Sequence, residues 1–428
     1  MKYLIVALIG ALASILANLG VAVFNDGLRP IVPEYEEGRM DKKALAATSF
    51  ALGFGLVIGF GIPFSITASI VLIHSILLAT DIIGSWAPKG KKGIIISGII
   101  GAAYGIGLVG GLKFIVDAFS HLPVNFLSQL GQVGTPIVAA FAAFPALVVG
   151  YQYGFKKGGL TLVITFLVRQ FIQYWGIFNI GTAKVTLNAD GMALLAGMII
   201  MLVFAMREKV DPNATSVDLS SLFSDRVKKI KRNIPYLAVM GGLIATATSM
   251  SLMAGDPISL NLLASGKDME AGLTALARGI GFIPLVATTA IATGVYGPAG
   301  MTFVFAVGLF IKNPVIAFIV GAIVISLEVL LLDILAKFLD KFPGVRKCGD
   351  NIRTSMSKML EVALLVGGMM AANAMAPGLG FLVVGGLYLL NQTSKKPLVN
   401  MAVGPVGAIL VGVLINILYV VGLYLPAK

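Results

Sequence analysis

The chain has 428 residues, of which 57% are hydrophobic and 12% are charged, and its mean hydropathy is +0.94. Soluble domains carry about 25% charged residues, so this chain lacks the polar surface that a water-soluble fold of its size requires. The composition excludes a soluble enzyme or binding module. It predicts an all-α polytopic membrane protein whose solvent and main partner is the lipid bilayer.

The formal net charge of +12 does not indicate nucleic-acid binding, because lysine and arginine gather in short links between apolar runs. This distribution is typical of cytoplasmic loops in membrane proteins. The single cysteine, Cys348, cannot form a disulfide within the chain, and the two histidines are His74 and His121. These residues are too few for a His/Cys metal cluster. We therefore expect no metal, no cofactor and no nucleic-acid partner.

Apolar runs of membrane-spanning length recur along the chain. A helix needs about 20 apolar residues to cross about 30 Å of hydrocarbon, and the first run is too long for the core of a signal peptide. We expect about 10–14 transmembrane helices, several of them broken by glycine or proline. The candidate spans are 3–24, 44–62, 64–80, 94–116, 135–155, 158–180, 191–206, 236–254, 272–294, 296–311, 314–335, 359–376, 378–393 and 398–425.

Basic residues indicate which links are cytoplasmic. The polar stretch 207–235 divides the chain into a first membrane half at 1–206 and a second at 236–428, with about six or seven spans in each. We predict that 207–235 is a cytoplasmic linker. The side on which Met1 lies stays open, since Lys2 favours the inside and the count of spans favours the outside. Further links are assigned by the same rule: 89–92, 156–157 and 337–358 inside, 120–134 and 181–190 outside.

Two sequence matches have the same separation along the chain and together predict two structural repeats. In an inverted repeat, which is typical of secondary transporters, the two halves cross the membrane in opposite directions. The expected topology places the first match on opposite membrane sides and the second in one direction, so the orientation of the repeat stays open. The matches pair Gly59-x-x-x-Pro63-x-x-x-Thr67 with Gly294-x-x-x-Pro298-x-x-x-Thr302, and Leu147–Tyr153 with Leu382–Tyr388.

Glycine and proline interrupt several apolar runs, notably around Pro63 and Pro298. Proline removes a backbone donor, and in lipid the freed carbonyl must be satisfied by protein, water or a ligand. Two interpretations stay open: simple kinks, or broken helices whose ends form a substrate site near the midplane. The stretch Gly105-Ile-Gly-Leu-Val-Gly110 matches a dinucleotide-binding pattern, but inside an apolar span its glycines are interpreted as helix-packing positions.

Ionisable side chains inside apolar runs are the strongest candidates for function, because a charge in the bilayer needs a partner, a cavity or a ligand. Arg169 is predicted to bind a substrate anion, and Glu328 to carry a proton or cation. A structural ion pair between these two residues is the alternative. The predicted site residues are Arg169, Gln170, Gln173, Pro63 and Pro298 for the substrate, and Glu328, Asp81 and His74 for ion or proton coupling.

The link after the first span, 25–43, is unusually rich in charge and places Asp26 and Arg29 at the membrane edge, in a solvated loop or a gate. This link, followed by Gly53-Phe-Gly-Leu-Val-Ile-Gly-Phe-Gly-Ile-Pro63-Phe-Ser65, resembles the YhfT family of bacterial inner-membrane proteins over essentially the whole chain. The resemblance implies a multi-pass protein of a bacterial cell inner membrane and a transport function. In layout alone, the chain is also similar to membrane subunits of ascorbate- and galactitol-type sugar phosphotransferase systems.

We predict a secondary transporter that moves a small polar or anionic metabolite by alternating access, without enzymatic activity. Near-equal halves, glycine–proline breaks and few but deep ionisable residues favour this function. The alternative is a membrane subunit of phosphotransferase-type sugar uptake with separate soluble partners, for which transport depends on a phosphorylated protein rather than an ion gradient. A membrane enzyme would need paired His or Asp near a span end, which this sequence lacks. A channel and a homodimer stay open.

Overall fold

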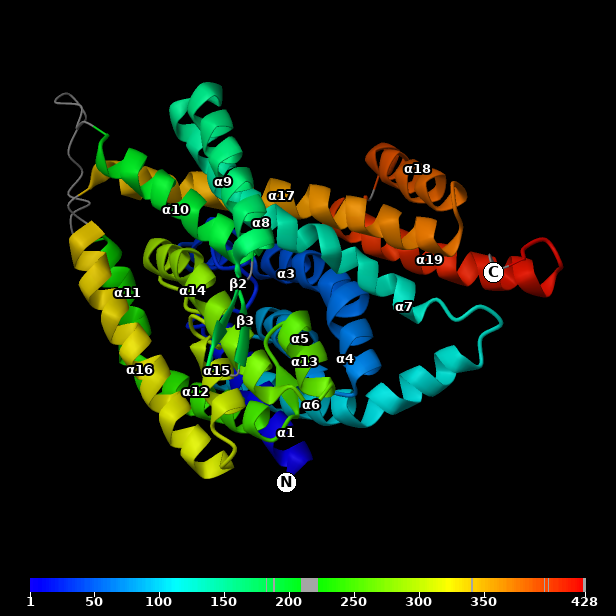
Figure 1. The fold of residues 1–428 in the computed structure, drawn as a ribbon, viewed down its shortest axis with the longest axis horizontal. Coiled ribbons are helices and arrows are strands. Elements are labelled where there is room, and N and C mark those ends of the chain that lie inside the picture. Colours follow the sequence, from blue (N-terminus) through cyan, green and yellow to red (C-terminus); the bar gives the residue numbers. More distant parts are fainter. Residues whose placement is uncertain are drawn as a thin grey trace.

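The computed structural model describes residues 1–181, 183–187, 189–208, 222–339, 342–395, 397–398 and 400–425. These residues are mostly helical, as Figure 1 shows. The first half contains α1 (Lys2–Asn18), α2 (Ile31–Glu36), α3 (Lys42–Leu56), α4 (Ile62–Ala68), α5 (Ile73–Trp86), α6 (Lys91–Ser120), α7 (Leu127–Leu130), α8 (Thr135–Tyr153), α9 (Phe155–Trp175) and α10 (Ala189–Met206). The second contains α11 (Leu222–Arg232), α12 (Ile234–Ser249), α13 (Pro257–Ala264), α14 (Asp268–Thr293), α15 (Phe303–Phe310), α16 (Pro314–Leu339), α17 (Pro343–Met375), α18 (Leu379–Thr393) and α19 (Asn400–Val420).

Three helices among the described residues are long and apolar enough to cross a membrane: Lys91–Ser120, Pro314–Phe338 and Val403–Val420. One face of α16 exposes a continuous series of large apolar side chains, an arrangement that suits contact with lipid rather than water. This series consists of Val315, Ile316, Ile319, Ile323, Leu327, Leu330, Leu331 and Ile334. The composition and these helices together define a helical membrane protein.

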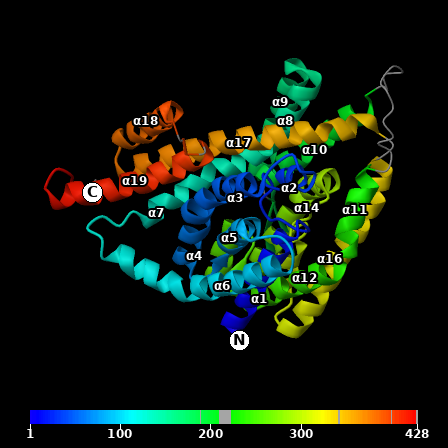
Figure 2. The same ribbon diagram turned by 180° about the vertical axis from the view of Figure 1, so that it is seen from behind.

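The two halves of the chain interlock. Helix α1 packs against α5 and α6, and α12 packs in the same way against α15 and α16. Close approach depends on glycine in both places, because a Cβ at Gly101 would overlap the carbonyl oxygen of Gly10, and one at Gly321 would lie 2.7 Å from the carbonyl oxygen of Gly241. In Figure 2, α17, α19 and α8 run across one end of the molecule, beyond these two bundles.

The helix-packing interpretation of the glycine-rich stretch in α6 is confirmed for part of that stretch. Gly105 lies against α1, where a Cβ would come within 2.6 Å of the carbonyl oxygen of Val6. Gly107 has no atom within 4 Å of the position a Cβ would take and is exposed. Small residues therefore bring α6 close to α1 along one face only.

Short extended segments join the two halves at two places. Strand β1 (Val71–Leu72) pairs in parallel with β4 (Met253–Ala254), and Ala22 forms an isolated parallel bridge with Tyr296. The backbone N–H of Val71 donates to the carbonyl of Leu252 at 2.9 Å, and that of Tyr296 donates to the carbonyl of Val21 at 3.0 Å. Each contact therefore joins the chain just beyond the end of a helix in one half to the chain just beyond the end of a helix in the other half.

Basic side chains from distant parts of the chain gather at one end of these bundles. Lys42 and Lys89 lie over the ring of Tyr35, at 5.2 and 4.2 Å from its centroid. Lys229 of α11 donates to the carbonyl of Gly20 at 2.8 Å, just beyond the end of α1. Burial and the nearby Lys89 ammonium lower the pKa of Lys42 from its ordinary value. We call this region the basic face, defined by Lys42, Lys89, Arg226, Lys229, Lys231 and Lys337.

The break in the first half does not lie at Pro63. The helix that starts at Lys42 passes through a π-helical turn at Val57–Gly61 into α4, and the chain leaves it at Ser69, where φ is 56°. Pro63 closely follows this π-helical turn, so the irregular turn lies where proline removes a backbone donor from the continuous helix. The expected equivalence of 59–67 with 294–302 is wrong, because the first segment is helical and the second is mostly a turn before α15.

Two other expectations need correction. The stretch 343–358 is part of α17 rather than a loop, since Pro343 starts a helix that continues to Met375. Helix α9 ends at Trp175, and the expected span to 180 is replaced by an antiparallel pair, β2 (Ile177–Ile180) and β3 (Ala183–Thr186). The second sequence match also joins unlike helices, because α8 packs on α9, α10 and α17, whereas α18 packs on α17 and α19.

Candidate functional site

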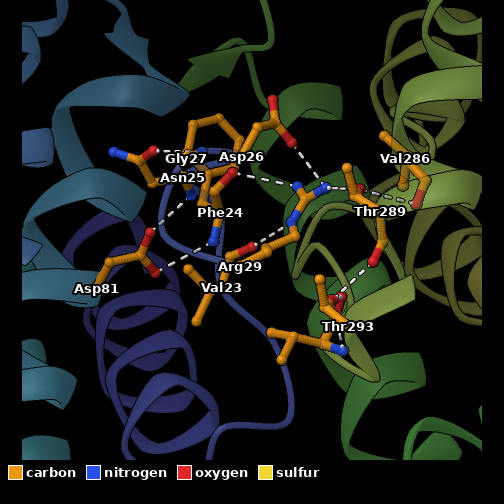
Figure 3. Close-up of polar contacts among 11 residues, drawn as sticks. Val23, Phe24, Asn25, Asp26, Gly27, Arg29, Asp81, Val286, Thr289 and Thr293 are labelled. Atoms are coloured by element: carbon orange, nitrogen blue, oxygen red, sulfur yellow. Dashed lines mark hydrogen bonds and ion pairs between the residues drawn. The ribbon is translucent and has the colours of Figure 1, made fainter. Parts of the chain in front are cut away.

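A buried polar cluster surrounds the segment between α1 and α2 (Figure 3). The carboxylate of Asp81, on α5, accepts the backbone N–H groups of Phe24 at 3.1 Å and Asn25 at 2.8 Å. The Asn25 side chain donates to the carbonyl of Leu52 at 3.0 Å and accepts from the N–H of Gly27 at 2.9 Å. Since helix α1 has ended, these side chains supply the partners that its backbone no longer provides.

Arg29 is the centre of this cluster and is only 3% exposed. Its guanidinium donates to the carbonyls of Val23 at 2.8 Å and Phe24 at 3.2 Å, and to the Thr289 hydroxyl of α14 at 3.0 Å. It also forms an ion pair with Asp26 at 2.7 Å (Figure 3). These contacts tie the segment to α14 of the second half, so Arg29 acts mainly as a positioning residue.

The second half contributes a matching arginine. Arg278, on α14, donates to the carbonyl of Gly255 at 2.6 Å and lies 3.6 Å from the carboxylate of Asp256, which caps α13. Its guanidinium stacks over Phe282 at 4.9 Å and lies near enough to Asp26 for their charges to interact. The side chains of Asp26 and Arg278 are 16% and 12% exposed, so both keep accessible surface inside a mostly buried region.

We call Asn25, Asp26, Arg29, Asp81, Asp256 and Arg278 the Asp26 cluster. His74 lies next to it, because its ring contacts the edge of the Phe24 ring with 5.1 Å between centroids. His74 and Asp81 are two turns apart on α5, and both contact Phe24. Of the predicted coupling residues, the structure therefore brings these two together at Phe24, beside the cluster.

Glu328 lies in α16 and is 4% exposed. Its Oε2 accepts hydrogen bonds from the Tyr296 hydroxyl at 2.6 Å and the Met301 N–H at 2.7 Å. Pro298 is buried in the same turn. The Arg29 guanidinium lies beside the neighbouring Gly297, since a Cβ at Gly297 would be 2.9 Å from Arg29 Nη2. The turn 297–302 therefore connects Glu328 with the Asp26 cluster.

Arg169 lies apart from this region. It is near the end of α9 rather than in its middle, where it pairs with Asp190 of α10 at 2.7 Å and donates to Gln173 at 3.2 Å. Its side chain is 34% exposed. The alternative of an ion pair between Arg169 and Glu328 is wrong, since each has other partners. The structure brings Arg169, Gln170 and Gln173 onto one helix end and does not join them to Asp81, His74, Glu328 or Pro298.

Sequence reasoning placed Asp26 and Arg29 at the membrane edge and gave no role to Arg278 or Asp256. Asn25 and Asp256 both stand seven residues beyond the end of an apolar helix, but this equal spacing emerges only when the structure fixes the ends of α1 and α12, since the expected spans ended at 24 and 254. The interaction that runs from Arg29 to Arg278 through Asp26 joins distant parts of the chain and leaves no trace in local sequence patterns. Only the packed structure places these groups together.

An interlocked helical fold with apolar helices and a buried charged cluster defines a membrane protein. The chain belongs to the YhfT family, since the model of that family, described as a protein of unknown function, matches residues 2–424. The chain is 36% identical over 439 aligned residues to the uncharacterized protein YhfT of Escherichia coli (strain K12), with 100% of this chain and 99% of that protein covered. No solved structure matches the chain.

Proposed function

We propose that this protein is a secondary transporter that moves a small polar or anionic metabolite across a bacterial inner membrane by alternating access. The observation that carries the proposal is the Asp26 cluster, in which buried charges from both halves meet where helices are interrupted. Intramembrane ionisable residues of this kind mark substrate and ion pathways. Interrupted helices whose ends face each other between two halves are the usual framework of such sites.

Paired contacts support two inverted repeats as the framework. Val21 and Leu252 are the third residues after α1 and α12, and Val71 and Tyr296 are the third residues after α4 and α14. Each hydrogen bond joins a residue of the first pair to a residue of the second pair from the other half of the chain: Val71 to Leu252, and Tyr296 to Val21. Helix α1 ends at the basic face, whereas α12 begins there, directly after α11. The repeated elements therefore run in opposite directions, with α1, α5 and α6 corresponding to α12, α15 and α16.

The basic face supplies a topology that can be tested. Positive residues favour the cytoplasmic side, so we expect the basic face inside and Met1 outside. In a Cys348→Ser background, an impermeant maleimide should label Lys267→Cys in intact cells and leave Lys228→Cys unlabelled until the cells are opened. Both native lysines are exposed, at 58% and 60%, so accessibility within the fold is matched. Labelling of Lys228→Cys in intact cells would reverse the orientation.

The substrate-binding role is assigned to Arg278, because its side chain is partly accessible and its guanidinium lies at the start of α13, beside Gly255 and Asp256. A guanidinium binds a carboxylate or phosphate through two parallel hydrogen bonds, which an ammonium cannot reproduce. After a thermal-shift screen of purified protein against a metabolite panel, uptake of any stabilising compound into proteoliposomes is measured. Arg278→Gln should abolish uptake, and Arg278→Lys should restore only a small part of it.

Arg169→Gln provides the matched comparison, since Arg169 is also an arginine in an apolar helix but lies outside the Asp26 cluster. We expect this variant to retain uptake. Its free energy of unfolding should lie within about 0–1 kcal/mol of the wild-type value, because an ion pair near the surface contributes no more than that. Loss of uptake in Arg169→Gln with normal uptake in Arg278→Gln would move substrate binding to α9. Uptake that requires a phosphorylated soluble protein rather than an ion gradient would favour the phosphotransferase alternative.

A further inference from the structure

Glu328 has an unusual environment for a carboxyl group in an apolar helix. Its Oε2 accepts two hydrogen bonds, while its Oε1 is buried and has no hydrogen-bond partner among the described residues. The turn is fitted closely around it, because a Cβ at Gly300 would overlap Oε2. The carboxyl group is therefore enclosed, with two neutral donors at Oε2 and a buried Oε1 that has no hydrogen-bond partner among the described residues.

No cation in the described residues forms an ion pair with Glu328. On its own helix, Asp333 and Lys337 pair with each other near the basic face, where Lys231 of α11 also contacts Asp333. Arg278 of α14 pairs with Asp256. The remaining ionisable side chains on the helices that pack against α16 are Asp225, Arg226, Lys228, Lys229 and Arg232 on α11, Tyr236 on α12, and Asp268 and Glu270 on α14, and α15 has none.

A buried carboxylate without a counter-charge is strongly disfavoured, and such a group is neutralised by taking up a proton. In the neutral acid, Oε2 would be the carbonyl oxygen that accepts the two hydrogen bonds and Oε1 would carry the proton. Loss of that proton to water leaves a carboxylate that cannot remain in this enclosure. The turn 297–302 must then open, or admit water or a cation, to stabilise the charge.

The same turn is mechanically connected to the Asp26 cluster. The Tyr296 hydroxyl donates to Glu328, and the Tyr296 backbone is bonded to the segment that follows α1. Its N–H donates to the carbonyl of Val21 at 3.0 Å, and its carbonyl accepts the N–H of Val23 at 2.7 Å. Val23 in turn holds Arg29 through its own carbonyl at 2.8 Å. A displacement of the turn therefore reaches Arg29 through a continuous series of hydrogen bonds.

We propose that Glu328 is the proton-carrying residue of the transporter, protonated when the turn 297–302 is closed over the Asp26 cluster and deprotonated when that turn opens. This inference rests on the proposed function for its transport consequence. The protonation of Glu328 and its control of the turn 297–302 can be tested without any substrate.

The first experiment measures the carboxylic-acid C=O stretch of purified protein by infrared difference spectroscopy against Glu328→Gln, with H/D exchange to separate it from lipid and detergent bands. We expect a band in the wild type that Glu328→Gln lacks. Asp333→Asn is the matched control on the same helix, since Asp333 bonds to Lys231 at 3.2 Å and Lys337 at 3.0 Å, and its removal should leave the band unchanged. Absence of a Glu328-dependent band overturns the proposal.

The second experiment follows hydrogen exchange of peptides that cover 295–302 as pH rises. Protection should be lost in the wild type and retained in Glu328→Gln, because the amide cannot ionise and still accepts the bonds from Tyr296 and Met301. Equal loss of protection in both proteins would mean that Glu328 only stabilises the turn and does not control its opening.

If a substrate is found, Glu328→Gln should retain substrate exchange across the membrane of proteoliposomes and lose substrate accumulation driven by a pH gradient. If no compound is transported while the band and protection results hold, the proposed function fails and the proton switch stands.

Discussion

Gly101→Val is expected to remove most of the folded protein from the membrane. The Cβ of any residue at 101 would overlap the carbonyl oxygen of Gly10, and the side-chain oxygen of Ser14 is equally close. The obstacle is backbone rather than the far end of a flexible side chain, so α1 and α6 must separate. Overpacking costs typically about 1–3 kcal/mol and more when backbone must move. The measurement is the yield of monodisperse protein by fluorescence-detected size-exclusion chromatography.

Gly107→Val is the matched control, on the same helix and with the same added side chain. Nothing lies within 4 Å of the Cβ position at Gly107, so its yield should equal that of the wild type. The proposed repeat adds a second expectation: Gly321→Val in α16 should fail as Gly101→Val does, because a Cβ there meets α12 at 2.6 Å from the Ala245 side chain. Normal yield from Gly101→Val would show that α1 and α6 do not pack as described.

Asp81→Ala is expected to cause a large loss of stability. Asp81 is 2% exposed and accepts the N–H groups of Phe24 and Asn25, so its removal leaves one buried and one partly buried donor without partners. Each unsatisfied buried group costs about 1–3 kcal/mol. Thermal unfolding in detergent should show a large decrease in Tm, and Asp81→Asn should fall between the wild type and Asp81→Ala, because one amide oxygen can still accept.

Asp117→Ala controls for the loss of an aspartate from a long helix of the same half, since Asp117 is exposed on α6. We expect its Tm to match the wild type. An unchanged Tm in Asp81→Ala would mean that the segment 23–27 is held by Arg29 and Asn25 alone. Asp81 would then be available for the ion-coupling role that its position in an apolar run suggests.

The amino-acid sequence by itself determined that this protein belongs in a membrane and is helical. Solvation decides that class, and solvation depends on composition and on the length of apolar runs, which are local properties. For the same reason the starts of α8, α10, α16 and α18 agree closely with the starts of the expected spans. The packing role of Gly105 was also accessible to sequence reasoning, because small residues in an apolar helix indicate close contact, but the exposure of Gly107 was not.

The tertiary structure decided where the helices break and which charges meet. A search at one fixed separation could not find the proposed correspondence, because Val21 and Leu252 are separated by a different length of chain from Val71 and Tyr296. Insertions between elements change the spacing while contacts are preserved. Arg169 stood out because it is a charge within an apolar run, yet its partner Asp190 lies on the next helix. Whether a buried charge is structural or functional depends on the groups around it, and only the folded chain supplies those groups.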